Sequence, residues 1–114
     1  MNTKRVYEYE VTVERVVDGD TIILNVDLGF KLWLHKLTCR MAGINASEMN
    51  TQAGIEAKTE LERMIAQGGG RYIVLSHGLD KYGRWLVDVL VGGGKTLNQL
   101  MIERGHAVAA IMAE

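Results

Sequence analysis

The chain has 114 residues, of which 47% are apolar and 24% charged, and its formal net charge at pH 7 is −1. This composition is that of an ordinary globular protein, and the length fits a single domain over residues 1–114. The near-zero charge excludes a general attraction to polyanions, so nucleic-acid binding would require a local basic patch. The single cysteine, Cys39, excludes an internal disulfide and is typical of a small buried apolar residue.

The N-terminal segment, Met1–Glu10, is polar and lacks the apolar core of a secretory signal. No apolar run elsewhere approaches the roughly 20 residues that a membrane-spanning helix needs. We therefore expect a cytoplasmic protein without a membrane partner.

The first part of the chain reads as three strands. Apolar and polar residues alternate over Tyr7–Val17, which predicts a half-buried strand. The segment Asp18–Thr21 contains an Asp-Gly pair typical of a tight turn, and Thr21–Val26 is the return strand. A long third strand is expected over Lys31–Ile44, with a bulge near His35–Leu37 where the alternation fails.

A helix is predicted after the third strand. In the segment Thr51–Gln67, apolar residues recur at the spacing of one helical face, and Asn50 or Thr51 can cap its first turn. Gly68–Gly70 then ends the helix. These glycines are better explained by a turn than by a phosphate-binding loop, because no strand precedes them and no helix follows.

Two further strands and a second helix complete the pattern. Strands are expected over Arg71–Leu75 and Trp85–Val91, a helix begins after Thr96, and Ala107–Met112 is expected to be extended. The order of three strands, a helix, two strands and a helix predicts a mainly β protein, a five-stranded OB-fold barrel. An open α+β sandwich is the alternative. Trp33 and Trp85 are strand residues, for which packing in the core or barrel is favoured over base stacking.

Four charged residues fall at strand ends or in adjacent loops: Asp20, Arg40, Glu48 and Arg84. Hydrolysis of a phosphodiester adds negative charge to the transition state and needs a base that takes a proton from water. Arginine pairs with two phosphate oxygens at once, a carboxylate can be that base, and an aspartate oxygen suits Ca²⁺ or Mg²⁺. Each residue also has an ordinary explanation, as a turn carboxylate, a surface ion pair or a stabiliser of a helix N-terminus.

Three motifs in this order resemble the staphylococcal nuclease (thermonuclease-type) family: Asp18–Thr21, Arg40–Glu48 and Asp80–Arg84. The likeness runs from about Val13 to Ala109. The resemblance implies a five-stranded OB barrel that hydrolyses phosphodiester bonds of DNA and RNA with Ca²⁺ and leaves 3′-phosphates.

The resemblance also implies a role for individual residues. Asp20 corresponds to a calcium-ligand aspartate, and Asn45 stands where a second ligand aspartate is usual. Arg40 and Arg84 correspond to the two phosphate-binding arginines, and the second also stabilises the leaving group. Glu48 corresponds to the general base. A further position, Tyr82, corresponds to a tyrosine that lines the nucleotide pocket.

Three departures from the family pattern affect these expectations. Asn45 keeps an oxygen ligand but removes a negative charge, which predicts weaker binding of Ca²⁺ or another divalent cation. Ser47 replaces a common proline, so the loop that carries Glu48 loses a rigid element. The chain ends at Glu114, before the family's third helix, and the first strand or a partner subunit of a homo-oligomer would cover the gap.

Two classes of function follow from the resemblance. The first is a metal-dependent, sugar-nonspecific nuclease that acts on DNA or RNA. The second is a nuclease-like module with weakened or lost catalysis that binds nucleic acid or a protein. Asn45 favours the second class, whereas the retention of Arg40, Glu48 and Arg84 favours the first.

Overall fold

The computed structural model describes residues 6–110. These residues form, in chain order, β1 (Tyr7–Asp18), β2 (Thr21–Asp27), β3 (Trp33–Met41), β4 (Ile44–Ala46), α1 (Gln52–Gln67), β5 (Arg71–Leu79), β6 (Trp85–Gly92), β7 (Lys95–Thr96), α2 (Leu97–Glu103) and β8 (Ala107–Ala109). The predicted extended segment at the C-terminal end is confirmed at β8, and residues 111–112 lie outside the described residues.

The strands β1, β2, β3, β5 and β6 form a closed barrel. They are hydrogen-bonded in the order β3-β2-β1-β5-β6, and a parallel pairing of β3 with β6 closes the ring. This pairing joins Cys39–Met41 to Trp85–Val87. The prediction of a mainly β, five-stranded OB-type barrel is therefore confirmed, and the open sandwich is excluded.

The third strand is shorter than predicted at both ends. It begins at Trp33 because Phe30 and Lys31, with φ of 55° and 64°, form a tight turn closed by the Leu32 amide and the Gly29 carbonyl at 2.9 Å. It ends at Met41 because the chain turns at Gly43, where φ is 77°. The residues that follow form the separate short strand β4, which pairs with β8.

The predicted bulge in this strand is confirmed. Leu24 lies opposite Leu37, and Val26 lies opposite Leu34, so β3 has one more residue than β2 between these pairs. Lys36 has a φ of 58° at the bulge. The extra residue shifts the alternation of side chains in the first half of the strand.

The two helices cover one end of the barrel. Thr51 caps α1 by accepting a 3.0 Å hydrogen bond from the Gly54 amide, as predicted, and the predicted apolar face is buried. The helix α2 begins with a capping box formed by Thr96 and Gln99. The fully buried core side chains come from the barrel and from both helices; the largest are Ile22, Leu24, Met41, Leu61, Leu97 and Met101.

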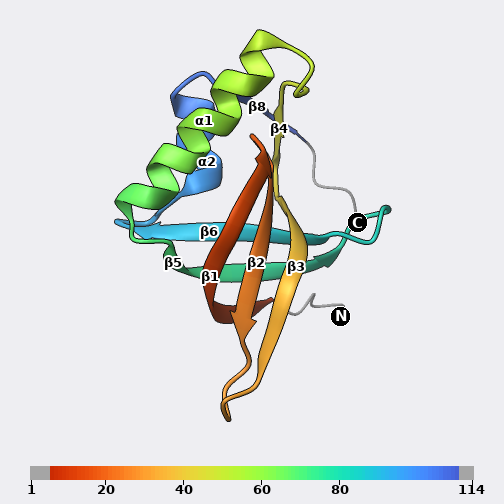
Figure 1. The fold of residues 1–114 in the computed structure, drawn as a ribbon, viewed down its shortest axis with the longest axis vertical. Coiled ribbons are helices and arrows are strands. Elements are labelled where there is room, and N and C mark those ends of the chain that lie inside the picture. The colour runs from red at the N-terminus through yellow and green to blue at the C-terminus, as the bar shows by residue number, and fades with distance from the viewer. Residues whose placement is uncertain (1–5, 111–114) are drawn as a thin grey trace, which may run out of the picture.

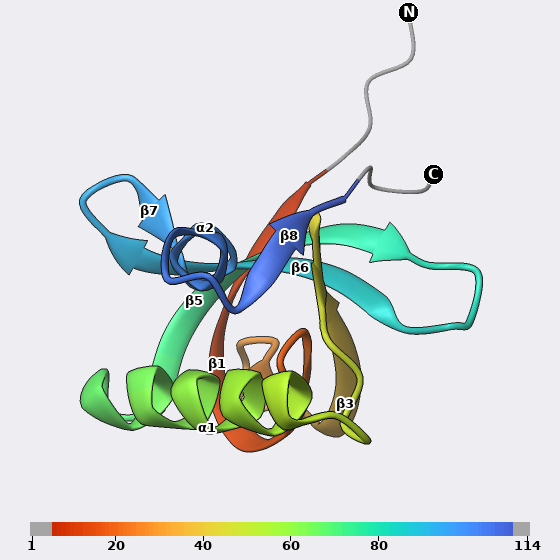
Figure 2. The ribbon, with the colours of Figure 1, turned by 90° about the horizontal axis from the view of Figure 1, so that it is seen from above.

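The helices and the β2–β3 hairpin lie at opposite ends of the molecule. The helices α1 and α2 lie beside the β4 end, whereas the tip of the β2–β3 hairpin projects from the other end (Figure 1). Seen from above, the connection between β5 and β6 extends beyond the barrel on the side of β3 (Figure 2). In residues 6–110, no helix is both long and apolar enough to span a bilayer.

Candidate active site

The turn between β1 and β2 fixes the carboxylate of Asp20. The Asp20 amide donates to Asp18 Oδ1 at 3.0 Å, and the Thr21 hydroxyl donates to Asp20 Oδ1 at 3.1 Å. The other oxygen, Asp20 Oδ2, accepts a 2.9 Å hydrogen bond from the Ala46 amide. The carboxylate is thus directed from the turn toward β4. Burial raises the pKa of Asp20 above its ordinary value, and Asp18 adds to this effect, whereas Ala46 and Arg40 oppose it.

The glycine of this turn is required by close packing. A Cβ atom at Gly19 would lie 2.7 Å from the Cβ of Ala46 and 2.8 Å from the Cβ of Ala57. These distances are shorter than van der Waals contact, so a larger residue would push the turn away from β4 and α1. The Asp-Gly-Asp sequence therefore both forms the turn and brings Asp20 against β4.

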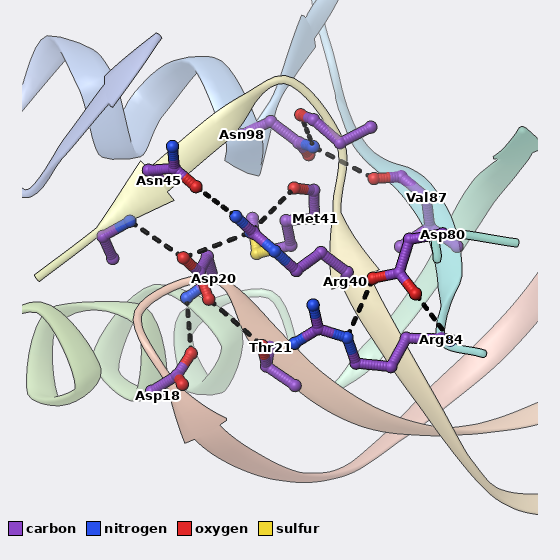
Figure 3. A network of polar contacts seen from close by, with 12 residues as sticks. Asp18, Asp20, Thr21, Arg40, Met41, Asn45, Asp80, Arg84, Val87 and Asn98 are labelled. Atoms are coloured by element: carbon purple, nitrogen blue, oxygen red, sulfur yellow. Dashed lines mark hydrogen bonds and ion pairs between the residues drawn. The ribbon is translucent and has the colours of Figure 1, made fainter. Parts of the chain in front are cut away.

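Arg40, near the end of β3, joins the turn to β4. Its Nη1 lies 3.1 Å from Asp20 Oδ2, and its Nη2 donates a hydrogen bond to Asn45 Oδ1 (Figure 3). The side chains of Arg40 and Asp20 are only 16% and 13% exposed, so this pair is partly shielded from water. The two predicted metal ligands, Asp20 and Asn45, therefore converge on the same guanidinium group.

The loop between β5 and β6 holds Arg84. The side chain of Asp80 accepts hydrogen bonds from the amides of Tyr82 at 2.8 Å and Arg84 at 2.9 Å, and its Oδ2 also binds Arg84 Nε at 2.9 Å. Gly83, with a φ of 80°, allows the tight turn. Burial of Asp80 alone would raise its pKa, but these hydrogen bonds and the Arg84 guanidinium lower it below the ordinary value.

Arg40, Asn45, Tyr82 and Arg84 line one open cavity of about 290 Å³. The guanidinium carbon of Arg84 lies 5.3 Å from the centre of the Tyr82 ring, which is typical of a cation–π contact. Tyr82 itself is 71% exposed, so most of its ring remains available to a ligand. The cavity combines two guanidinium groups with an accessible aromatic face, a combination suited to a nucleotide phosphate and its base.

Glu48 lies in the loop between β4 and α1, outside the lining of this cavity. Its carbonyl oxygen accepts hydrogen bonds from the Thr51 amide at 3.0 Å and the Thr51 hydroxyl at 2.6 Å, so the backbone is fixed. The residue is exposed, and within residues 6–110 its carboxylate makes no hydrogen bond or ion pair. Of the four residues predicted to meet, Arg40 and Arg84 line the cavity. Asp20 does not line it but is bound to Arg40, and Glu48 lies outside.

Comparison with protein families shows to which family the chain belongs. A family model described as staphylococcal nuclease homologue matches residues 38–114, about two thirds of the chain. The chain belongs to the staphylococcal nuclease family. The matched region contains the motifs Arg40–Glu48 and Asp80–Arg84, whereas the motif Asp18–Thr21 lies before it. A comparison with curated proteins gave no match.

The family resemblance implies a calcium ion. The side-chain donors present are of the type that binds such an ion, but they are too few to complete its coordination. Asp20 offers a carboxylate and Asn45 an amide oxygen, both hard ligands that Ca²⁺ and Mg²⁺ accept. Both oxygens are bound to a positive group, the Arg40 guanidinium. Among the described residues, no group of three or more His, Cys, Asp or Glu side chains could hold a metal ion. Backbone carbonyls or water molecules would have to supply the remaining ligands.

Two positioning residues of this nuclease-family site were not predicted from the sequence. Asp80 was part of a motif but received no role, although an Asp followed three residues later by a Gly, here Gly83, is a recognisable turn signal. Asn98, only 4% exposed, donates to the carbonyls of Ala42 at 2.8 Å and Val87 at 3.0 Å. It ties the turn between Arg40 and Asn45 to β6 (Figure 3). A polar residue on the buried face of a helix was the available signal.

Proposed function

We propose that this protein is a metal-dependent, sugar-nonspecific nuclease that hydrolyses phosphodiester bonds of DNA or RNA. The observation that supports this most directly is the presence of Arg40 and Arg84 in the wall of one open cavity. Two guanidinium groups on one cavity can bind different oxygens of the same phosphate. Membership of a nuclease family supports the same reaction class.

In the proposed reaction, Arg40 and Arg84 bind the phosphoryl oxygens and oppose the charge that develops on them. Glu48 takes a proton from a water molecule as the water oxygen forms a bond to phosphorus. The bond from phosphorus to the 5′-oxygen breaks, and Arg84 stabilises the charge on this leaving oxygen. The products are a 3′-phosphate and a 5′-hydroxyl, which receives a proton from solvent.

A divalent cation held by Asp20 and Asn45 would supply further positive charge near the phosphate when bound. Arg40 now occupies both ligand oxygens, so we propose that phosphate and cation bind in a coupled manner. As Arg40 turns toward a phosphate, Asp20 and Asn45 become available to the cation.

The test is digestion of denatured DNA in Ca²⁺, Mg²⁺ or chelator by the parent protein and two variants. We expect the parent to cleave and Glu48→Gln to be slower by roughly 10²- to 10⁴-fold, since a general base typically contributes this much. Glu56→Gln is the control, because Glu56 is also an exposed carboxylate near the start of α1. Equal rates for Glu48→Gln and the parent would contradict the proposed base, and cleavage unaffected by chelator would contradict the metal.

The second candidate, a binding module with weakened catalysis, is favoured by Asn45 and by the position of Glu48 outside the cavity. In that case the parent would not cleave DNA with any of the metals. Asn45→Asp would restore cleavage, because it returns a negative charge to the cation position. Retained affinity of the inactive parent for DNA, RNA or a protein would then identify its role.

A further inference from the structure

The barrel contains an apolar cavity at the end away from the helices. Its volume is about 200 Å³, and all five barrel strands contribute to its wall. The floor is formed by buried side chains, among them Leu24, Cys39 and Val74. Leu28 and Leu34 form an exposed rim. These two residues flank the tip of the β2–β3 hairpin, so the cavity opens at the hairpin end of the barrel (Figure 1).

A small side chain on β5 leaves this space. Side chains alternate along a strand, so Tyr72, Val74 and Ser76 share one face of β5, and the first two are buried in the core. Ser76 therefore faces the barrel interior. It is the smallest of the side chains that line the cavity. Interior positions of small barrels are normally filled by side chains, so the cavity exists because serine stands at this position.

The two tryptophans lie on different sides of the barrel wall. Trp85 lines the cavity, which confirms its predicted packing in the barrel. The bulge at Lys36 lets both Leu34 and Leu37 face the cavity, whereas Trp33 lies outside and is exposed. For Trp33, the predicted packing in the core is therefore wrong. The cavity thus has an aromatic wall at Trp85 and aliphatic walls on the other strands.

The chemistry of the wall disfavours water and ions as occupants. No charged side chain belongs to the described residues that line the cavity, so an ion would lose its hydration without gaining a partner. Burial raises the pKa of the Cys39 thiol to about 12, so this group stays neutral as well. A stably bound water needs about two to four polar partners, and Ser76 and Tyr9 carry the only hydroxyl groups among these lining residues.

The hydroxyl group of Ser76 is available to a ligand. Within residues 6–110 it makes no hydrogen bond. A serine hydroxyl can donate one hydrogen bond and accept others. A ligand that carries a hydroxyl group can therefore pair with Ser76, whereas a purely apolar ligand leaves this group without a partner.

We propose that the barrel cavity binds a small, neutral aromatic molecule with one hydroxyl group, of the size and chemistry of a phenol. The ring contacts Trp85 and the aliphatic wall, and its hydroxyl group pairs with Ser76. An apolar cavity of about 150 Å³ is large enough for benzene, so a cavity of about 200 Å³ also admits a substituent. This cavity shares no lining residue with the candidate active site, so the proposal does not depend on the proposed nuclease function.

The experiment titrates the protein with phenol and with toluene, which has a methyl group in place of the hydroxyl. The readout is fluorescence in a Trp33→Phe background, in which Trp85 is the single tryptophan. We expect saturable binding of both probes with dissociation constants on the order of 0.1 to 1 mM, as suits a ligand of about seven heavy atoms. Ser76→Ala should weaken phenol by roughly 2- to 10-fold, because one hydrogen bond is lost, and leave toluene unchanged.

Two substitutions to leucine locate the site. Ser76→Leu fills the cavity and should abolish binding of both probes. Thr38→Leu is the matched control and should bind them like the parent, because Thr38 is exposed on β3 and does not line the cavity.

A measurement on the unsubstituted protein does not depend on the folding of any variant. Phenol and toluene should raise the midpoint of thermal unfolding as their concentration increases, since a ligand of the folded state stabilises it. Benzoate, a charged ring of similar size, should not. A midpoint that none of the three probes raises would overturn the proposal, as would an equal rise with benzoate. Equal affinity of Ser76→Leu and the parent, or an equal loss of phenol and toluene in Ser76→Ala, would also overturn it.

A second copy of this chain is the alternative occupant. Phe30 stands at the hairpin tip beside the cavity mouth and is 97% exposed, so its ring could enter the cavity of another molecule. In that case Phe30→Ser would bind the probes more tightly than the parent, because the competing ring is removed. This result would overturn the small-molecule site, whereas equal affinity of Phe30→Ser and the parent would support it.

Discussion

At the scale of single residues, the candidate site depends on carboxylates that hold arginines. Asp20 binds Arg40 and Asp80 binds Arg84, at 3.1 Å and 2.9 Å. The Arg84 guanidinium, held by Asp80, has lost much of its side-chain freedom before a phosphate arrives, so less entropy is lost on binding. Asp80 therefore influences phosphate affinity without touching the phosphate.

Asp80→Asn tests this positioning role. The asparagine oxygen can still accept the amides of Tyr82 and Arg84, so the turn persists, but the ion pair with the Arg84 guanidinium is lost. We expect kcat/KM on denatured DNA to fall by roughly 10- to 100-fold, the equivalent of one charge-assisted hydrogen bond. In an Arg84→Ala background the same substitution should have no further effect. Additive losses would show that Asp80 acts independently of Arg84.

Asn45→Asp tests the metal position. A second carboxylate beside Asp20 adds negative charge to a hard-oxygen ligand set, so Ca²⁺ affinity should rise. Titration calorimetry measures this directly, without reference to activity. Asn25→Asp is a matched control, because Asn25 is also a strand asparagine but lies beside the β3 bulge. Equal Ca²⁺ affinity of Asn45→Asp and the parent would place the cation elsewhere.

At the scale of elements, the start of α1 positions the loop that carries Glu48. Gly54 lies in the first turn of this helix, and a Cβ atom there would be 1.9 Å from the carbonyl oxygen of Glu48. This loop therefore packs on the helix through a contact that only glycine permits. The loop that carries Glu48 and the first turn of α1 are thus packed as one unit.

Gly54→Ala should therefore destabilise the protein, although alanine is the better helix former. We expect a loss of about 1–3 kcal/mol in the free energy of unfolding from the forced backbone shift, measured by urea denaturation. Thr59→Ala, at an exposed position of α1, should instead change stability by less than about 1 kcal/mol, in the favourable direction. A Gly54→Ala variant that is more stable than the parent would contradict this prediction and would mean that the loop shifts away from the helix at little cost.

At the scale of the whole molecule, a few contacts join the two helices that cover the barrel end. Glu60 of α1 binds Arg63 at 2.6 Å and Arg104, at the end of α2, at 2.7 Å. Hydrogen bonds from Arg63, and then from Arg104, lower the pKa of Glu60 from 4.5 to about 2. This carboxylate therefore connects α1 to the C-terminal part of the chain.

The lowered pKa predicts how stability depends on pH. The ionised form is favoured in the folded state, so the contribution of Glu60 is complete above pH 4.5 and is lost as the pH falls toward 2. Glu60→Gln should reduce stability at neutral pH by about 1 kcal/mol, as expected for partly exposed ion pairs, and the difference from the parent should disappear in acid. Glu62→Gln, which removes a carboxylate from an exposed position of the same helix, is the matched control.

Local sequence patterns predicted the elements well because their causes are local. The alternation in β1, the Asp-Gly turn, the Thr51 cap and the bulge near His35–Leu37 each depend on residues close in the chain. The order of the elements predicted the five-stranded barrel, and the family resemblance implied a role for each candidate site residue. The expectation of a homo-oligomer stays a prediction.

The tertiary structure determined which residues that are distant in the sequence contact one another. The sequence by itself determined the order of the strands and helices and which charged side chains stand at their ends. It did not determine that Arg40 binds both Asp20 and Asn45, that Glu48 lies outside the cavity, or that Trp33 is exposed. These depend on barrel closure, on a turn packed against β4 and on the face that a bulge selects, and such contacts between distant segments leave no periodic signal in the chain.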